Sequence, residues 1–243
     1  MALELLTLAR DAAYIEPSGI HVHIGSQIET IDPYLETVKF LEDLILQLDS
    51  MEIVIEYIDL GGGIGINYKT QIGSKDYPST YLKNILPGLL KPFNNKKYNV
   101  LIELGRSIIG PAGILVTQVL YIKETPKKKF IIVDAAMNNL IRPSLYDAYH
   151  QILPLTNTVE STEMVDVVGP VCETTDFFAK DRLLPKINEG DYLVVGGAGA
   201  YGQALSSNYN LRPTIAEYLI DDDRVHTIFK GESIEDIALR YNI

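Results

Sequence analysis

The feature that most constrains the fold is an apolar, β-branched run at residues 53–60 that stops at three consecutive glycines, Gly61, Gly62 and Gly63. Such a run is typical of a strand buried on both faces, as in a parallel sheet. Because glycine has no Cβ atom, the backbone after this strand can adopt positive φ angles and approach a ligand closely. A strand that ends in bare backbone suits a phosphate-binding turn. Taken alone, the run is explained slightly better as a turn that only needs positive φ.

The first part of the chain alternates between helical and extended patterns. Helices are expected at 3–14, 32–49 and 80–90, and strands at 20–24, 53–60 and 99–103. Alternation of this kind predicts right-handed βαβ units in a parallel sheet or barrel. Groups that bind ligands gather at the C-terminal ends of parallel strands. The ends of these three strands are therefore the first place to look for a site.

Beyond about residue 111 the pattern changes to short strands between turns, with a short helix within 138–150 and a final helix at 233–241. The strands are expected at 114–123, 130–134, 165–171, 192–195 and 225–229. We divide the chain into an α/β domain, residues 1–112, and an all-β domain with a terminal helix, residues 113–243. A full (β/α)8 barrel takes roughly 250 residues. The first domain is therefore either a small open sheet or the last strands of a partial (β/α)8 barrel.

Charge and cysteine content exclude several classes of protein. The 21 lysines and arginines against 32 aspartates and glutamates give a net charge of −11, which argues against nucleic acid or an anionic membrane as partner. The single cysteine, Cys172, cannot form an intrachain disulfide, so we expect a reducing, cytoplasmic location. The N-terminus resembles an amphipathic helix, not a signal peptide, and no apolar run has the length of a membrane span.

The predicted strand ends carry complementary groups: His23 with Ser26, the three glycines, and Glu103 with Arg106. Glycine backbone and a serine hydroxyl suit a phosphate, a glutamate suits a protonated ring nitrogen, and a histidine can stack on a ring. Together they favour a phosphorylated aromatic cofactor. Alone, His23 fits a hydrogen-bonded core histidine better, and Glu103 also fits an ion pair with Arg106.

The second domain offers a different set of polar groups. Arg142 and Tyr146 can clamp a carboxylate through a guanidinium fork and a phenol, although a surface arginine beside a turn fits equally well. Cys172 and Glu173 follow a Gly-Pro turn, and a lone cysteine is more often a small buried hydrophobe. Tyr201 is the one large residue in 198–202, which indicates either crowding around something bound or an ordinary glycine-bearing turn.

No metal site is expected from the motifs. The sequence has no zinc-ligand spacing, nucleophile elbow or Walker lysine. His21 and His23 lie on the same face of a predicted strand, but no third ligand is evident beside them.

Taken together, the motifs resemble the diaminopimelate decarboxylases, which belong to the alanine-racemase-like (fold type III) pyridoxal-phosphate decarboxylases and have ornithine and arginine decarboxylases as cousins. They occur in the order of that family and cover nearly the whole chain. The matching stretches are 19–27, 59–65, 103–106, 133–143, 169–176 and 198–202.

The resemblance implies pyridoxal 5′-phosphate as the cofactor and a two-fold homodimer with shared sites. It assigns catalytic roles to His23, which stacks on the pyridine ring, to Cys172, near the carbon that is protonated, and to Glu173, on the distal amine of the substrate. It places cofactor contacts at His23, Ser26, Gly61, Gly62, Gly63, Glu103, Gly105, Arg106 and Tyr201. It places substrate contacts at Arg106, Arg142, Tyr146, Glu173 and Tyr201.

The implied reaction is the decarboxylation of meso-2,6-diaminopimelate to L-lysine by a carboxy-lyase. Two departures from the family pattern stand out. Leu104 replaces a proline, and the family's Schiff-base lysine lies on an early barrel strand that this sequence does not contain. We therefore expect these residues alone to be inactive and a separate N-terminal fragment to supply the missing part. The alternatives are a non-catalytic truncated fragment, a dimerisation or cofactor-docking module, and a decarboxylase of ornithine or arginine.

Overall fold

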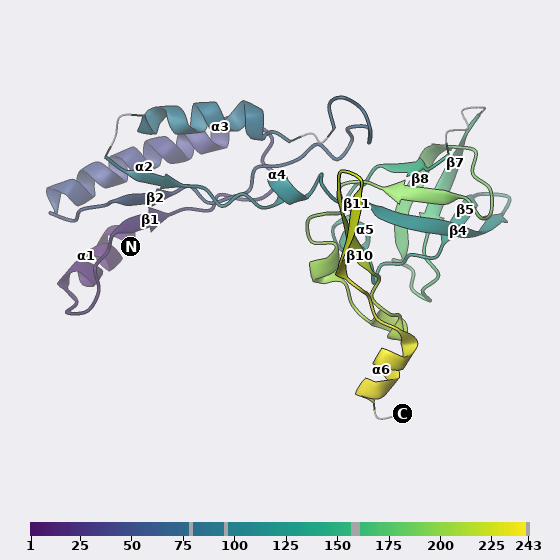
Figure 1. The fold of residues 1–243 in the computed structure, drawn as a ribbon. Helices are drawn as coiled ribbons and strands as arrows, with labels where there is room; N and C mark the ends of the chain where they lie inside the picture. The colour runs from purple at the N-terminus through teal and green to yellow at the C-terminus, as the bar shows by residue number, and fades with distance from the viewer. Residues whose placement is uncertain (78–79, 95–96, 157–160, 242–243) are drawn as a thin grey trace. The chain divides into compact units, whose positions relative to one another are not determined.

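The structure is a computed structural model of the chain that describes residues 1–77, 80–94, 97–156 and 161–241. The described residues divide into two compact units (Figure 1). The first unit contains residues 1–67 and 80–110, and the second contains residues 68–77 and 111–241. The first is an α/β unit and the second is built mainly from strands, so the expected combination of α/β and all-β parts is confirmed at this level.

The first unit contains a parallel sheet of strand order β1-β2-β3, with helices between the strands as the sequence predicted. Its helices and strands are α1 (Ala2–Asp11), β1 (Gly19–His21), α2 (Asp32–Ser50), β2 (Tyr57–Asp59), α3 (Leu82–Leu90), the 3-10 helix η1 (Lys91–Phe93), β3 (Asn99–Leu101) and α4 (Arg106–Ile109). Pro87 is accommodated inside α3 without ending it. The three strands are in register, with Ile20, Ile58 and Val100 side by side.

The core of the first unit lies on one face of this sheet. Ile58 of β2 is fully buried against the apolar stripe of α2, which includes Leu41 and Leu48. The expectation that residues 53–60 are buried on both faces is wrong, because the side chains alternate. Val54 is 62% exposed and Tyr57 is 41% exposed. Only the face covered by helices needs apolar residues, and the other face carries the polar groups of the strand ends.

The second unit is a six-stranded mixed sheet of strand order β6-β9-β4-β5-β7-β8, followed by a separate hairpin and a short helix. Its elements are β4 (Leu115–Glu124), β5 (Lys129–Val133), α5 (Arg142–Tyr146), β6 (Ile152–Pro154), β7 (Thr162–Val168), β8 (Phe177–Pro185), β9 (Tyr192–Val195), the 3-10 helices η2 (Gln203–Leu205) and η3 (Tyr209–Leu211), β10 (Glu217–Asp221), β11 (Arg224–Phe229) and α6 (Ile234–Arg240). Its core includes Ile131, Val167 and Leu193, from three different strands.

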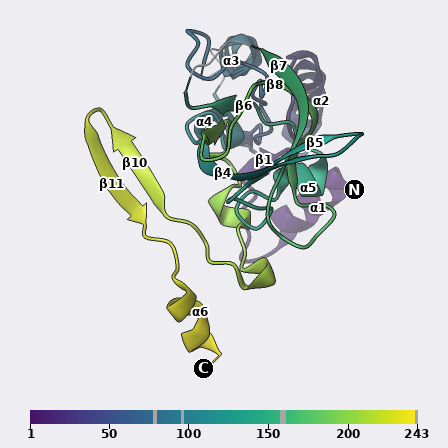
Figure 2. The same cartoon turned by 90° about the vertical axis from the view of Figure 1, so that its right-hand side faces the viewer.

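Strands β10 and β11 form an antiparallel hairpin of their own. Figure 2 shows this hairpin as a two-stranded ribbon that leads into α6. Every residue of β10 is exposed, and Ile220 and Val225, which face each other across the hairpin, are 71% and 67% exposed. Among the helices that the structure describes, none is both long enough and apolar enough to cross a membrane.

Candidate functional site

The glycine run joins the ends of the three parallel strands by close backbone contact. The Val22 amide donates to the Asp59 carbonyl, and the Glu103 amide donates to the Gly61 carbonyl, each at 2.9 Å. A Cβ atom at Gly61 would lie 2.2 Å from the Val22 carbonyl oxygen, and one at Gly62 would lie 2.3 Å from the Glu103 carbonyl oxygen. The glycines are therefore required by the approach of neighbouring strand ends, in addition to the positive φ of +66° at Gly61.

Tyr34 of α2 fixes this glycine turn through a buried hydrogen bond. Its side chain is 2% exposed, and its hydroxyl donates to the Gly62 carbonyl at 2.9 Å. Burial raises the pKa of the Tyr34 phenol to about 12, so the hydroxyl stays protonated and can donate. No motif of the sequence predicts this role for Tyr34. Its only signal is a phenol within the otherwise aliphatic stripe of a predicted helix.

The predicted side chains at the strand ends are gathered in the first unit and are accessible. His21 Nε2 lies 3.2 Å from Glu103 Oε2, and Arg106 donates to Ser26 Oγ at 3.0 Å. His23 is exposed, so the alternative of a buried core histidine is wrong. Glu103 thus has His21 as a hydrogen-bond partner, a pairing that the motifs do not predict.

Asp59 joins this group from β2. Its carboxylate accepts the Gly61 amide at 2.9 Å, and His21, Asp59 and Glu103 each place one candidate ligand atom within 4.8 Å of the others. His21 faces Asp59 directly across β1 and β2. The motifs pointed to no third ligand beside His21 and His23, so this arrangement of His21 with Asp59 and Glu103 was not predicted. The signal was the alternation of strand residues, which puts His21 and Asp59 on the same face.

The first-unit groups fit a phosphorylated pyridine. The Ser26 hydroxyl and the Arg106 guanidinium form a hydrogen-bonded pair of donor groups, as a phosphate requires. The space beside Gly25 and Gly105, where a Cβ atom would stand, is open to at least 4 Å. The exposed Glu103 carboxylate offers a charge partner for a ring nitrogen, and the exposed His23 imidazole offers a face for stacking.

Arg142 lies in the second unit, at the start of α5, and is only 6% exposed. It donates to the Tyr68 hydroxyl at 2.8 Å, and its Nη1 lies 3.1 Å from His150 Nε2. His150 is fully buried, with Nδ1 2.8 Å from the Gly196 carbonyl, which fixes the proton on Nδ1 and leaves Nε2 to accept. The alternative of a surface arginine is therefore wrong. Tyr146, on the same helix, is 65% exposed.

The loop that carries Cys172 and Glu173 is tied to the segment before Arg142. Buried Asp176 accepts the amides of Met137 and Val171, each at 2.7 Å. Burial raises the pKa of Asp176, and these two backbone donors act in the opposite direction. Cys172 is exposed, so the alternative of a buried hydrophobe is wrong. Two sets of predicted substrate-binding residues thus lie on connected segments of one unit.

Tyr201 lies in the turn after β9, with a positive φ of +65° and 45% exposure. The crowding expected around residues 198–202 comes from the chain itself. A Cβ atom at Gly113 would lie 2.4 Å from Gly199 Cα, and the Ala198 amide donates to the Gly113 carbonyl at 2.8 Å. The roles of Tyr201 in binding cofactor and substrate stay predictions.

The comparisons with known proteins agree with the motifs. The profile of the family described as pyridoxal-dependent decarboxylase, C-terminal sheet domain, matches residues 22–199. Diaminopimelate decarboxylase of Aquifex aeolicus is 47% identical over 224 residues, which are 92% of this chain and 52% of that protein. The enzyme of that name from Helicobacter pylori is 38% identical over 237 residues, 97% of this chain and 57% of that protein.

Solved structures show the same likeness. A protein of Aquifex aeolicus superposes with a TM-score of 0.90 at 44% identity, covering 99% of this chain and 58% of that one. Diaminopimelate decarboxylase of Helicobacter pylori, solved in complex with L-lysine, has a TM-score of 0.85 at 38% identity, with the same two coverages. The chain thus spans little more than half the length of these relatives. Because the family profile covers most of its residues, this chain belongs to the pyridoxal-dependent decarboxylase family.

Proposed function

We propose that these residues form part of an enzyme that decarboxylates meso-2,6-diaminopimelate to L-lysine with pyridoxal 5′-phosphate. The observation that carries the proposal is the pair of contacts between the ends of β1 and β3, His21 with Glu103 and Ser26 with Arg106. A carboxylate and a hydroxyl–guanidinium pair are the groups that a pyridine nitrogen and a phosphate require. Relatives at 38% and 47% identity bear the name diaminopimelate decarboxylase, which favours this substrate over ornithine or arginine.

The bound cofactor supplies an electron sink for the charge left on the substrate when its α-carboxylate departs. In this proposal Glu103 holds the proton on the ring nitrogen, and His23 stacks on the ring. The phosphate is held by Ser26 and Arg106, together with backbone at Gly61, Gly62, Gly63 and Gly105.

The second-unit residues take the substrate in this proposal. Arg142 and Tyr146, with Arg106, bind the distal carboxylate, and Glu173 binds the distal amine. Cys172 lies near the carbon that receives a proton. Burial of Arg142 supports its role, because a guanidinium held by Tyr68 and His150 presents a fixed charge to a carboxylate.

The proposal extends to architecture and assembly. We propose that the three parallel strands are the last strands of a (β/α)8 barrel, that residue 112 marks its end, and that a C-terminal β domain follows. A homodimer with shared sites, a separate chain that contributes the Schiff-base lysine, and a cytoplasmic location belong to the same proposal. The exposed position of Cys172 and Glu173 supports shared sites, because it leaves both side chains accessible to a partner.

The test uses the protein expressed from its full gene, together with the separate chain that contributes the Schiff-base lysine, and loaded with pyridoxal phosphate. We expect lysine and carbon dioxide from meso-diaminopimelate, with little turnover of ornithine or arginine. Glu103→Gln should lower kcat by about 10²-fold, the scale of losing one preorganised electrostatic group at the reacting centre. The matched control is Glu56→Gln, an exposed glutamate outside the strand-end group. Equal activity of Glu103→Gln and wild type would rule out the role given to Glu103, and preferential turnover of ornithine would replace the proposed substrate.

A further inference from the structure

Tyr209 contacts the predicted amine-binding carboxylate from a separate loop. Its hydroxyl donates to Glu173 Oε2 at 3.1 Å, across 36 residues of sequence. Nothing in the motif that contains Glu173 predicts this partner. A neutral donor on one carboxylate oxygen leaves the negative charge in place and limits rotation of the carboxylate. The contact therefore restricts the orientation of the Glu173 carboxylate and leaves that carboxylate able to bind an ammonium ion.

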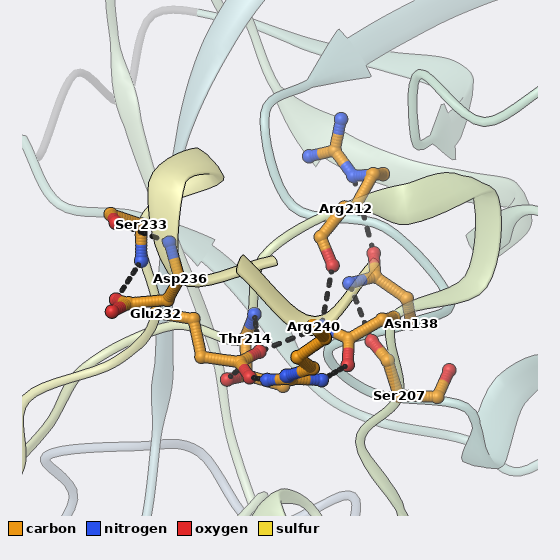
Figure 3. Close-up of polar contacts among 9 residues, drawn as sticks. Asn138, Ser207, Arg212, Thr214, Glu232, Ser233, Asp236 and Arg240 are labelled. Atoms are coloured by element: carbon orange, nitrogen blue, oxygen red, sulfur yellow. Dashed lines mark hydrogen bonds and ion pairs between the residues drawn. The ribbon is translucent and has the colours of Figure 1, made fainter. Parts of the chain in front are cut away.

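The loop that presents Tyr209 is anchored by Glu232, which contacts residues on both sides of Tyr209. This carboxylate accepts Asn208 Nδ2 at 2.6 Å and the Thr214 hydroxyl at 2.7 Å, and it forms an ion pair with Arg240 of α6. Arg240 also donates to Asn208 Oδ1 at 2.8 Å. Figure 3 shows Glu232, Thr214 and Arg240 meeting at one point. Asn208, the residue directly before Tyr209, is thus held through both the nitrogen and the oxygen of its side-chain amide.

The same loop is also anchored by Asn138, which is 1% exposed. Asn138 and Ser207 exchange two hydrogen bonds, at 2.9 and 3.2 Å, and Arg212 Nε donates to Asn138 Oδ1 at 3.2 Å (Figure 3). The loop is therefore tied at residues 207, 208 and 212, on both sides of Tyr209. The segment that follows Asn138 leads to Arg142, so one scaffold supports both predicted substrate-binding sets.

The backbone beside Tyr209 is strained in a way that this scaffold maintains. Asn210 and Leu211 have φ angles of 58° and 55°, in the left-handed region that leucine rarely adopts. Consecutive residues in this region persist only where surrounding contacts fix them. Because this strained turn directly follows Tyr209, the fixed backbone limits the movement of the Tyr209 ring.

We propose that Tyr209 is a positioning residue that orients the Glu173 carboxylate toward the distal ammonium group of a diamino acid substrate. This inference rests on the proposed function, since it takes the role of Glu173 from it. Its chemistry is the recognition of one ammonium group by a carboxylate whose direction is fixed. Asn138, Asn208, Glu232 and Arg240 form the scaffold that fixes the Tyr209 loop. Through Arg240 this scaffold includes the C-terminal helix α6.

A titration tests the contact without reference to activity. The Glu173 hydrogen bond raises the pKa of the Tyr209 phenol, because the carboxylate favours the neutral hydroxyl over a phenolate. We expect Glu173→Gln to lower the pKa of Tyr209 toward its ordinary value, followed by NMR of ring-labelled tyrosine with Tyr209→Phe to assign the signal. Glu235→Gln, an exposed acid on α6, is the control and should leave it unchanged. An unchanged Tyr209 titration in Glu173→Gln would overturn the inference.

Kinetics of the protein from its full gene test the role. Tyr209→Phe should raise KM for meso-diaminopimelate by about threefold to tenfold, the scale of one hydrogen bond, with kcat within about twofold of wild type. In a Glu173→Gln background the same substitution should change KM little, because the two residues act as a pair. Tyr218→Phe, in exposed β10, is the matched control. An unchanged KM in a Tyr209→Phe protein with wild-type melting would contradict the inference.

The outcomes separate the inference from the proposed function. A wild-type protein with no activity on meso-diaminopimelate contradicts the proposed function, and the titration then decides alone whether Tyr209 holds Glu173. An active wild type with equal KM in Tyr209→Phe contradicts only the positioning role. A KM increase that persists unchanged in the Glu173→Gln background also contradicts it, because the effect then comes from elsewhere in the loop.

Discussion

Tyr34 contributes to the site through the backbone that it holds. Its hydroxyl donates to the Gly62 carbonyl at the centre of the glycine turn. Gly62 in turn lies so close to Glu103 that any side chain would collide with its carbonyl. A residue on α2 therefore sets the position of a residue after β3. Substitution of Tyr34 should affect stability first and the site only through it.

Replacing Tyr34 by phenylalanine should lower the free energy of unfolding by about 1–3 kcal/mol, because the Gly62 carbonyl is left without its buried donor. Urea unfolding of the two proteins measures the difference. Tyr14→Phe is the control, because Tyr14 is fully exposed. A loss no larger than that of Tyr14→Phe would show that the hydrogen bond adds nothing to stability.

Tyr34→Phe should also change how the free energy of unfolding depends on pH in the alkaline range. The pKa of Tyr34 is raised from 10.0 to about 12 in the folded chain, so the unfolded state loses this proton first. Between these two values the folded state binds more protons, and stability falls as pH rises. Tyr34→Phe should remove that part of the fall in an unfolding series through this range. Parallel curves for the two proteins would contradict the raised pKa.

Single residues also show how far sequence reasoning reaches. The order of polar residues after predicted strands predicts that His23, Ser26, Glu103 and Arg106 gather. The structure brings Arg106 to Ser26 across the ends of β1 and β3, while the roles of all four residues stay predictions. The partners within the group were not predicted. Glu103 pairs with His21, because pairing depends on the register between strands and on the length of each side chain.

At the scale of elements, sequence patterns found the helices and strands whose faces differ most clearly. The stripe of α2 and the run before the glycines were located, although only Tyr57–Asp59 of that run forms a strand. Strand β8 was missed, because Lys180, Asp181 and Arg182 interrupt its apolar pattern. Asp181 has a positive φ of 45° at an irregular point of the β7–β8 pairing, and Asp166 accepts its amide at 2.7 Å. A hydrogen bond between residues this far apart in the chain produces no periodic pattern in the sequence, so β8 could not be predicted from it.

Helix α6 begins with a capping box, in which Ser233 accepts the Asp236 amide and Asp236 accepts the Ser233 amide. Ser233→Ala should weaken the helix by about 1 kcal/mol, measured by hydrogen exchange of its amides. Glu235→Gln is the control, since Glu235 lies in the same turn but outside the box. Equal exchange in Ser233→Ala and wild type would contradict a role of the cap.

The cap should also respond to acid. The hydrogen bonds from Ser233 lower the pKa of Asp236 below its ordinary value of 3.8. The contribution of this carboxylate is therefore present above 3.8 and is lost as pH falls through its lower folded pKa. Exchange of the α6 amides should accelerate in that window in wild type, and this acid-dependent step should be absent in Asp236→Asn.

At the scale of the whole molecule, large apolar side chains remain on the surface in both units. Leu101 on the uncovered face of the first sheet is 48% exposed, and the hairpin strands expose Ile220 and Val225. Exposed apolar surface and unpaired strand edges promote association. The net charge of −11 opposes it only through long-range repulsion, which salt screens.

We therefore expect these 243 residues to associate when expressed alone, more strongly at high salt, as measured by light scattering. Replacing both Ile220 and Val225 by threonine should reduce association, because threonine keeps β propensity and removes the apolar pair. Leu8→Thr, an exposed apolar position on α1, is the comparison for the hairpin. A sharp melting transition of a monomer would contradict the expectation.

The alternation of helices and strands, the order of the polar strand ends and the family of the chain can all be read from the amino-acid sequence. These follow from local periodicity, from glycine and from motifs that are contiguous in the chain. The three-dimensional fold was needed to show that Arg142 is buried beside His150, that Tyr34 bonds the glycine turn and that Tyr209 contacts Glu173. Each of these contacts joins residues on separate elements, and its geometry depends on strand register and packing, which no local pattern encodes.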